Sequence, residues 1–495
     1  MIADILTFLL RYAFFANILF AMVVIFFEKR SVATTWAWLM VVFLLPYIGF
    51  ILYMAIGFES RKFGTFAAKS RSSESSIREI EKLDIEGLSF MRAPDKDDNV
   101  ARFKKLLAAE NISDLMYLNF VSGGGHLSFK NDLQLLSHGD DKFGSLIQDI
   151  LEARSFIHIQ YYIFRNDNIG KKLVAALAQK AREGVEVRLL IDGMGNLGVN
   201  KRRLFKPLLQ AGGMLGVFLT PHFFRVNFHN HRKLCIVDGK IGYIGGFNVG
   251  DEYLGQVRRY GFWRDMHLRI VGDAVKEMEV HFLLDWNFVC PKSKIVAQDK
   301  YFPVIKVDEC AIQGAMLQII SSGPDTKWPN IYNGFVKMMS EANKSIYIQT
   351  PYFAPDENIF ESLKIAALSG IDVRVIIPKN PDHVFVKWCS LSYLGELLRA
   401  GVKLYLYNNG FIHSKMIMID NLVASVGTTN MDMRSFKLNF EINAFIYDYD
   451  VCARLRERFY SDLDDCDEVT LEQYNARPVT QKIKEAFSRL LSPLL

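Results

Sequence analysis

The sequence is poor in cysteine and has no concentrated tract of basic residues. Among its 495 residues, six cysteines are scattered without the paired spacing of a zinc site or a disulfide framework. His222, His229 and His267 also lack neighbours at metal-ligand spacing. A Lys- and Arg-rich run with interleaved aromatic residues, typical of nucleic-acid binding, is absent too. We therefore expect no bound metal, no disulfide and no nucleic-acid partner. The expected free thiols are Cys235, Cys290, Cys310, Cys389, Cys452 and Cys466.

Charge is also missing from two long apolar stretches near the N-terminus. Residues 5–27 carry a single charge, at Arg11, and residues 33–58 carry none. Each run matches the roughly 20 residues that an α-helix needs to cross a bilayer. A cleaved signal peptide is the alternative for the first run, but this run lacks a basic start and a small-residue cleavage site and leads straight into the second. The pattern predicts a transmembrane helical hairpin over residues 1–58.

The residues after this hairpin are polar and mixed in charge. We expect residues 59–111 to form a tether with a helical stretch near 100–109. Basic residues are more frequent after the hairpin than in its turn, which favours a cytoplasmic location for the main body. The formal net charge of +5 suits a body that rests on an anionic lipid surface, although charge alone would also attract nucleic acid.

Further along, the chain repeats itself. The strand-like segment 153–164 matches 342–353, and the helix-then-strand segment 181–192 matches 366–378. The matches keep the same order and lie about 180 to 190 residues apart, as expected of an internal duplication. The continuous Val, Ile and Leu runs are typical of buried strands in a sheet that helices cover on both faces. The sequence therefore predicts a duplicated α/β unit.

The duplication divides the rest of the chain into two lobes. We place the first lobe at residues 112–310 and the second at 311–495, each with a mixed β-sheet flanked by helices. The last segment, 479–490, has helical spacing with basic residues opposite apolar ones. It could lie on a membrane surface or pack on its own domain, and packing is the interpretation that we favour.

One motif occurs once in each lobe. Residues 231–238, HRKLCIVD, and residues 413–420, HSKMIMID, both read HxKxxxxD. In each copy six residues separate the aspartate from a glycine, and an asparagine follows three positions after the glycine. The pattern comprises His231, Lys233, Asp238, Gly245 and Asn248 in the first copy and His413, Lys415, Asp420, Gly427 and Asn430 in the second. Two complete copies at corresponding places indicate a function rather than a chance match.

The spacing of the motif brings a histidine and a lysine to one face of a strand. Side chains two positions apart on a strand point to the same side, whereas Arg232 or Ser414 between them points away. A phosphate group suits this set, because neutral imidazole can act as a nucleophile, ammonium balances the phosphate oxygens and the asparagine amide adds hydrogen bonds. The motif predicts phosphodiester chemistry without a metal ion, since Lys233 and Lys415 supply the positive charge.

The segments HNHRKLCIVDGKIGYIGGFN and FIHSKMIMIDNLVASVGTTN resemble the motifs of the phospholipase D superfamily, from about residue 131 to the C-terminus. The resemblance implies that both motifs form a single active site across a pseudo-two-fold interface. His231 would attack phosphorus to give a phosphatidyl-histidine, while His413 would protonate the leaving alcohol and deprotonate the incoming one. Asp238 and Asp420 complete the catalytic set, in supporting roles. Because the two histidines need opposite protonation states, we expect a bell-shaped pH dependence.

The resemblance also implies a carboxylate that orients each histidine. Glu441 stands where family members carry the carboxylate of the second-motif histidine, so we assign it to His413. The matching position in the first lobe is Asp265, displaced by an insertion, and we assign it to His231. A carboxylate on the second ring nitrogen would fix the tautomer and orientation of each imidazole.

The N-terminal hairpin and the two complete motifs look like the cardiolipin synthase branch of the superfamily. This resemblance implies that one phosphatidylglycerol gives its phosphatidyl group to the enzyme and a second attacks through its glycerol hydroxyl, giving cardiolipin and glycerol. No cofactor is needed, since one phosphodiester is exchanged for another. Two alternatives remain open: a phospholipase D that hydrolyses the same intermediate to phosphatidic acid, and a membrane-bound nuclease.

Overall fold

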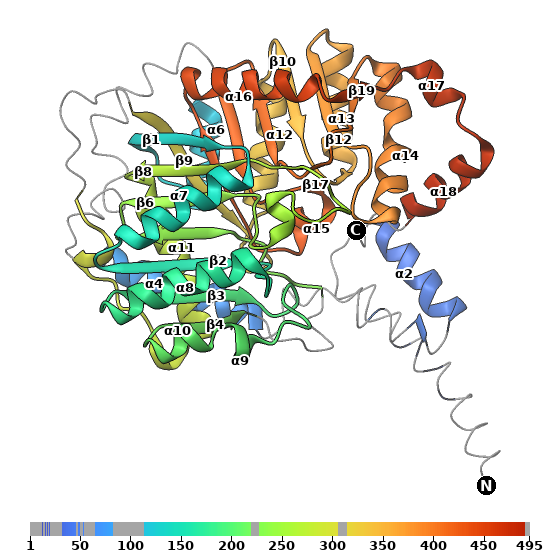
Figure 1. Ribbon diagram of the computed structural model, residues 1–495. Helices are drawn as coiled ribbons and strands as arrows, with labels where there is room; N and C mark the ends of the chain where they lie inside the picture. Colours follow the sequence, from blue (N-terminus) through green and yellow to red (C-terminus); the bar gives the residue numbers. More distant parts are fainter. Residues whose placement is uncertain are drawn as a thin grey trace. The chain divides into compact units, whose positions relative to one another are not determined.

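The computed structural model describes residues 32–45, 48–49, 65–82, 113–218, 227–304 and 314–490, with Tyr12, Phe15, Asn17, Leu19 and Tyr53 as single positions. Figure 1 labels its helices and strands. The α-helices are α2 (Val32–Leu44), α4 (Thr65–Lys82), α6 (Ser113–Gly123), α7 (Gly139–Glu152), α8 (Asn168–Arg182), α9 (Lys201–Leu204), α10 (Lys206–Gln210), α11 (Ala274–Val289), α12 (Asn330–Glu341), α13 (Glu357–Leu368), α14 (Val384–Ala400), α15 (Met433–Lys437), α16 (Tyr449–Leu463), α17 (Leu471–Asn475) and α18 (Val479–Leu490), and the 3₁₀ helices are η5 (Asp251–Leu254), η6 (Pro291–Ser293) and η7 (Asp299–Tyr301).

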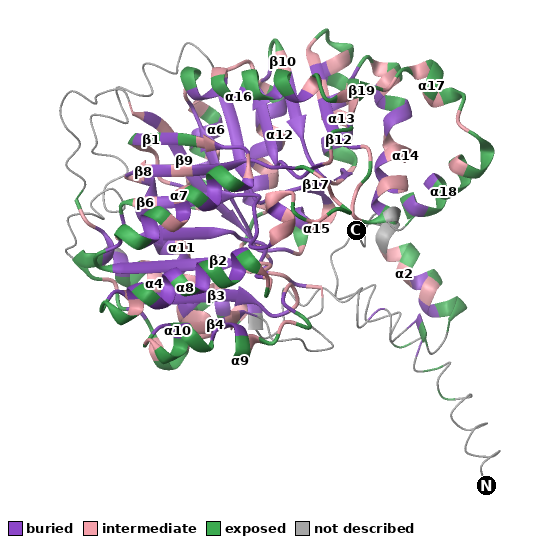
Figure 2. Cartoon of the chain, viewed as in Figure 1, coloured by how far each residue is buried: buried purple, intermediate pink, exposed green. Residues whose placement is uncertain are grey.

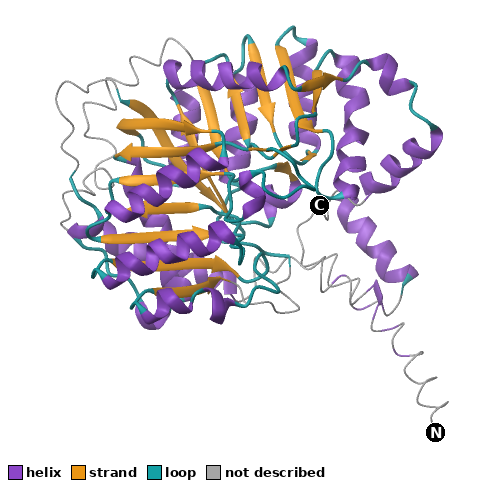
Figure 3. Ribbon diagram, in the orientation of Figure 1, coloured by secondary structure: helices purple, strands orange, loops and turns teal. Residues whose placement is uncertain are grey.

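The strands are β1 (Ser128–Leu136), β2 (Phe156–Tyr161), β3 (Glu186–Asp192), β4 (Met214–Phe218), β5 (Leu234–Val237), β6 (Ile241–Gly245), β7 (Trp263–Arg264), β8 (His267–Gly272), β9 (Ala315–Ser322), β10 (Ser345–Gln349), β11 (Phe353–Ala354), β12 (Asp372–Pro378), β13 (Lys403–Tyr407), β14 (Phe411–Ile412), β15 (Met416–Ile419), β16 (Val423–Gly427), β17 (Met431–Asp432), β18 (Glu441–Ile446) and β19 (Cys466–Glu468). Figure 3 distinguishes these strands from the helices and loops.

The chain forms two compact units, one of residues 1–68 with 221–228 and one of residues 69–220 with 229–495. In the first unit, α2 is a helix of 13 residues without a charged side chain. Within the described residues, no helix combines the length and apolar character needed to span a membrane. The predicted span 5–27 lies outside the described residues except for four single positions, and the span 33–58 is described over α2 and a few further positions. The hairpin therefore stays a prediction.

In the second unit, one sheet of 15 strands runs through both lobes in the order β19-β13-β12-β10-β15-β16-β18-β9-β1-β8-β6-β5-β2-β3-β4. The antiparallel pair of β1 and β9 lies near its centre. Outward from this pair, β8, β6, β5, β2, β3 and β4 occupy the places that β18, β16, β15, β10, β12 and β13 occupy on the other side. The internal duplication and the mixed α/β fold are confirmed, and the two lobes share a single continuous sheet rather than separate ones.

Helices cover both faces of the sheet, as the alternation of side chains along the inner strands shows. In β2, Ile157 and Ile159 pack in the same apolar core as residues of α7 and α8. His158 and Gln160 point to the opposite face, where they contact Glu279 and Asp285 of α11. The second lobe repeats this layout, with α12 and α13 on one face of β10 and α16 on the other. Buried residues line the sheet in both lobes (Figure 2).

The segment expected to be a tether contains an ordered helix. Lys69 of α4 is only 2% exposed, and its Nζ lies 2.5 Å from Asp325 and 3.1 Å from Asp285. These two carboxylates hold the pKa of Lys69 above its usual value, although burial alone would lower it. The helical stretch predicted near residues 100–109 lies outside the described residues.

Candidate active site

Each motif histidine is held by a short parallel pairing with the opposite lobe. The backbone N–H of His231 donates to Phe440 O at 2.9 Å, and Phe440 N–H donates to His229 O at 2.8 Å. Likewise, β14 of the second lobe pairs in parallel with β7 of the first lobe, and His413 N–H donates to Arg264 O at 2.7 Å. Since the strands of both lobes also belong to one sheet, these pairings bring the two motifs to one place.

The same pairings give each histidine a carboxylate from the other lobe. Nδ1 of His231 lies 3.0 Å from both carboxylate oxygens of Glu441, and Nδ1 of His413 lies 2.7 Å from Oδ2 of Asp265. The prediction that paired Glu441 with His413 and Asp265 with His231 is therefore wrong. The carboxylates follow directly after Phe440 and Arg264, the residues that pair with the opposite lobe, so each one reaches across the lobe boundary.

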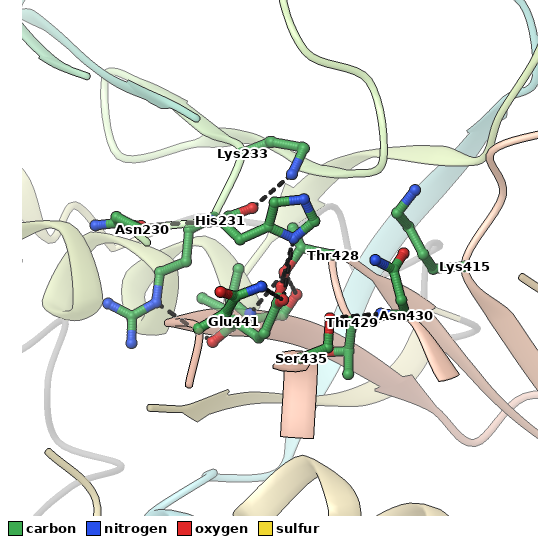
Figure 4. Close-up of polar contacts among 12 residues, drawn as sticks. Asn230, His231, Lys233, Lys415, Thr428, Thr429, Asn430, Ser435 and Glu441 are labelled. Atoms are coloured by element: carbon green, nitrogen blue, oxygen red, sulfur yellow. Dashed lines mark hydrogen bonds and ion pairs between the residues drawn. The ribbon is translucent and has the colours of Figure 1, made fainter. Parts of the chain in front are cut away.

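Both carboxylates are fully buried and further hydrogen-bonded. Glu441 accepts from Thr428 Oγ1 at 2.5 Å and from Asn439 Nδ2 at 3.2 Å, so the carboxylate below the His231 ring has a fixed position (Figure 4). Burial alone would raise its pKa, but His231 and Lys233 hold the pKa of Glu441 below its usual value. Asp265 likewise has a lowered pKa despite its burial, because Lys415 and His413 favour its charged form. Both groups are carboxylates at neutral pH.

The imidazoles that face these carboxylates are neutral. Burial lowers the pKa of His231 to about 4 and outweighs the attraction of Glu441. The pKa of His413 is also lowered to about 4, by burial first and then by Lys415. A neutral ring that donates from Nδ1 to a carboxylate keeps the lone pair on Nε2. Each histidine thus has a free nitrogen with which to act as nucleophile or base.

The two motif lysines are buried beside the histidines. Lys233 Nζ donates to His231 O at 2.6 Å, and Lys415 Nζ lies 2.7 Å from His413 Nδ1. Burial lowers the pKa of Lys233 to about 7 and that of Lys415 to about 8. A buried ammonium group with few hydrogen-bond partners is strongly stabilised by an anionic ligand. Both lysines can therefore bind the oxygens of a phosphate group.

A cavity of about 440 Å³ is lined by residues of both motifs, whereas the buried Lys233 and Lys415 lie behind the histidines and are not among its lining residues. His231, His413, Asn248 and Asn430 line it. The two asparagines differ: both polar atoms of Asn248 are used within the protein, by Ile163 N and the Tyr253 hydroxyl. In contrast, Oδ1 of Asn430 is buried and has no hydrogen-bond partner among the described residues.

Asp238 and Asp420 lie away from this cavity, so their placement in the catalytic set is corrected. At about 3.3 Å per residue, the strand carries Asp238 about 16 Å beyond Lys233. The carboxylate of Asp238 accepts three backbone N–H groups of residues 154–156, and that of Asp420 accepts three of residues 343–345, all at 2.7 to 2.9 Å. Both residues have positive φ, 52° and 53°, in the turn after the motif strand. They fix this turn to the start of the neighbouring strand.

Sequence reasoning missed several residues that line the cavity. His229 lies two positions before His231, and its Nε2 is 2.7 Å from Nη2 of Arg434, which follows Asn430 by four positions. Burial lowers the pKa of His229 to about 3, so it is neutral and can accept from this guanidinium. The spacing of His229 and His231 places both on one side of the chain, and this signal could have indicated His229.

Buried ion pairs hold the carboxylate residues from the other face of the sheet. Arg232, between the motif His and Lys, donates to Glu441 O at 3.3 Å and to Asp285 of α11 at 2.5 Å. Arg264 contacts Asp265 O and donates to both carboxylate oxygens of Asp462 on α16, at 2.7 and 2.8 Å. Through these arginines, α11 and α16 hold the two histidine-carboxylate pairs in place from the opposite face of the sheet.

No group of three or more His, Cys, Asp or Glu side chains within the described ranges is arranged to hold a metal ion. The five cysteines that the structure describes are free thiols, as expected, and Cys310 lies outside the described residues.

The chain matches the model of the cardiolipin synthase PLD-like domain over residues 146–286 and 335–463, and that of the phospholipase D-nuclease N-terminal region over residues 15–57. It is 45% identical to the major cardiolipin synthase of Bacillus subtilis over 98% of this chain and 99% of that protein. It is 45% identical to a cardiolipin synthase of Staphylococcus aureus over 98% and 96%, and 42% identical to one of Listeria monocytogenes over 99% of each.

Among solved structures, the phosphatidylserine synthase of Haemophilus influenzae resembles this fold with a TM-score of 0.58. The similarity covers 77% of this chain and 100% of that one, at 16% sequence identity. At this identity the likeness supports the fold alone.

Proposed function

The chain belongs to the family of cardiolipin synthases with phospholipase D-like domains, a family of phosphatidyltransferases, and from this premise we propose that it transfers a phosphatidyl group between two phosphatidylglycerol molecules through a phosphohistidine. The observation that carries the proposal is the pair of cavity histidines, each fixed through Nδ1 by a carboxylate of the opposite lobe. This arrangement gives one site two imidazoles with free Nε2 atoms and two buried lysines for the phosphate oxygens.

In the first step, Nε2 of neutral His231 attacks phosphorus, and the bond from phosphorus to the glycerol oxygen breaks. Protonated His413 gives its proton to that oxygen, so glycerol leaves as an alcohol. Because burial lowers the pKa of His413 to about 4, His413 must take up its proton when the anionic phosphodiester enters. Lys233 and Lys415 balance the phosphate charge, and Oδ1 of Asn430 can accept from a headgroup hydroxyl.

In the second step, neutral His413 takes the proton of a hydroxyl on the second phosphatidylglycerol, whose oxygen attacks phosphorus. The phosphorus–nitrogen bond breaks, its electron pair returns to His231, and His413 again holds the proton. Cardiolipin and glycerol are the products. Water could replace the second lipid with the same residues, which is why a hydrolytic phospholipase D is the alternative.

Product analysis separates transfer from hydrolysis. We expect the purified full chain to convert phosphatidylglycerol in detergent micelles or vesicles into equal amounts of cardiolipin and glycerol. Thin-layer chromatography of the lipids, with an enzymatic assay for glycerol, measures both. Phosphatidic acid as the sole lipid product would show a hydrolase instead.

The lowered lysine pKa values predict a pH effect. With pKa values of about 7 for Lys233 and about 8 for Lys415, both charges are present at low pH and lost as the pH rises through these values. His413 must also gain a proton, which becomes harder at high pH. We therefore expect kcat/KM for phosphatidylglycerol to fall between about pH 6 and pH 9, since this parameter reports the free enzyme. Initial rates at low substrate measure it, circular dichroism excludes unfolding, and a flat profile would contradict the assignment.

We further propose that the N-terminal residues attach the enzyme to the membrane as a hairpin, with spans over residues 5–27 and 33–58 and lobes over residues 112–310 and 311–495 on the cytoplasmic side. The uncharged helix α2 supports the hairpin, and so does the match of residues 15–57 to the phospholipase D-nuclease N-terminal model. The distribution of basic residues supports the cytoplasmic side. An anchored site would draw both substrates from the bilayer and favour a lipid over water as acceptor.

A further inference from the structure

The last described helix, α18, turns its polar face to the protein and its apolar face outward. Glu485 and Ser488 are the buried residues of this helix, 3% and 2% exposed. Its large apolar side chains are 58 to 78% exposed: Val479, Ile483, Phe487 and Leu490. A surface helix normally does the reverse, since burial of apolar area drives packing. Figure 2 shows exposed residues along α18.

Polar contacts hold α18 in this orientation. The buried carboxylate of Glu485 accepts from Arg477 Nη1 at 2.5 Å and from Gln481 Nε2 at 2.9 Å. On the same side, α18 packs along α14, and Arg489 lies 5.2 Å from the ring centre of Tyr393. Rotating the apolar stripe inward would break both of these hydrogen bonds of Glu485 and the ion pair with Arg477. The outward stripe is therefore built into the domain.

Basic residues flank the apolar stripe on both sides. At about 100° per residue, the four apolar side chains fall within an arc of about 80°. Lys484 projects about 100° to one side of Ile483, and Lys482 and Arg489 project about 100° to 120° to the other. All three flanking residues are exposed, and each also contacts the protein: Lys484 lies over the ring of Trp388, Arg489 near that of Tyr393, and Lys482 donates to Asn475 O. An apolar stripe between two rows of cations is the pattern of a helix that lies in a membrane interface.

We propose that α18 docks on an anionic phospholipid bilayer, with Val479, Ile483, Phe487 and Leu490 in the headgroup and upper acyl region and Lys482, Lys484 and Arg489 on the lipid phosphates. The charge of the flanks selects an anionic surface over a second copy of this chain, because two identical basic rims would repel each other. This choice rests in part on the proposed function, since a lipid-transferring enzyme works at such a surface.

The helix α14 connects this surface to the active-site cavity. Its first turns, with Phe385, Val386 and Cys389, line the cavity that holds both histidines. Phe385 is 56% exposed at this end, and further along α14 packs against α18. Docking of α18 therefore places an apolar part of the cavity rim close to the bilayer, where the acyl chains of a bound lipid can remain.

Hydrogen–deuterium exchange on the full chain tests this docking independently of turnover. We expect the backbone amides of residues 479–490 to exchange at least about tenfold more slowly in vesicles containing phosphatidylglycerol than in pure phosphatidylcholine vesicles, because a docked helix opens less often. Added salt should reduce this protection. The double variant Ile483→Glu/Phe487→Glu should lose it and should raise the apparent KM for vesicle phosphatidylglycerol at least about tenfold, with kcat in detergent micelles unchanged.

A matched control is available on α6. Tyr117 and Val121 have the same spacing of four residues and similar exposure, 65% and 61%, but no basic residue follows in the last turn of that helix. The variant Tyr117→Glu/Val121→Glu should keep the protection of residues 479–490 and the KM. Equal exchange in both kinds of vesicle, or protection that depends only on protein concentration, would overturn the proposal. A chain that shows the protection but makes no cardiolipin would instead refute the proposed function.

Discussion

Replacing either His231 or His413 by alanine will lower the rate of cardiolipin formation by at least about 10⁴-fold. Both side chains line one cavity, and the two proposed steps need one as nucleophile and the other as acid and base. The double variant should be little worse than either single variant, because residues that act as a unit are not additive in catalysis. Cardiolipin formed from radiolabelled phosphatidylglycerol over long incubations measures rates this low.

His126 provides the control for this experiment. It lies outside the cavity and is partly exposed, so His126→Ala should retain the wild-type rate. If His231→Ala or His413→Ala kept more than about one hundredth of the rate, the two-histidine mechanism would be wrong. Additive losses in the double variant would indicate two separate sites.

Removing the charge of Glu441 or Asp265, the carboxylates that bind the histidine of the opposite lobe, will have the next largest effect on the rate. Glu441→Gln and Asp265→Asn keep the shape but replace the charged acceptor of each Nδ1–H with a neutral amide, whose NH2 group can favour the other tautomer, and we expect losses in kcat of about 10²-fold or more. The structure also predicts that the two variants impair different steps of the reaction. Glu441 holds the nucleophile His231, whereas Asp265 holds the acid His413. A donor with p-nitrophenol as leaving group needs no acid, so it should restore the first step in Asp265→Asn but not in Glu441→Gln.

A second buried histidine-carboxylate pair provides the control. His158 and Glu279 are both fully buried, with Nδ1 2.7 Å from the carboxylate, but they lie outside the cavity. Glu279→Gln should reduce stability and leave kcat near the wild-type value. Restoration in Glu441→Gln rather than in Asp265→Asn, measured as the burst of p-nitrophenol, would reverse the roles of the two histidines.

Features encoded by local pattern were predictable from the sequence. The duplicated segments fixed the matching of β2 with β10 and β3 with β12, because apolar strands and their preceding helices leave clear signals. The apolar run after each motif lysine likewise predicted the strands β5 and β15, although His and Lys precede these strands rather than lie on them. Such patterns depend on neighbours within one strand or helix, so the sequence contains them directly.

The crossing of the carboxylates could not be predicted in this way. Glu441 lies 210 residues from its partner His231, and Asp265 lies 148 residues from His413. Their pairing depends on how the two lobes meet, which no local spacing records. A comparison of equivalent positions assigns each carboxylate to its own lobe, whereas the inter-lobe backbone pairing exchanges them.

The motif aspartates and asparagines show a second limit. Asp238 and Asn248 belong to the same repeated pattern as His231, yet their side chains bind backbone or neighbouring side chains of the fold. A residue that is repeated in both lobes can have a structural role in a turn as well as a role in the reaction. The positive φ of Asp238, which explains the need, appears only in the structure.

The central claim is that His231 carries the phosphatidyl group in a site that it shares with His413. The most direct measurement is mass spectrometry of the His413→Ala variant after reaction with a phosphatidyl donor that has p-nitrophenol as leaving group. Such a donor needs no acid for the first step, and the variant lacks the base for the second, so we predict one phosphatidyl group on the peptide that contains His231. An adduct on another residue, or release of p-nitrophenol without any adduct, would contradict the account.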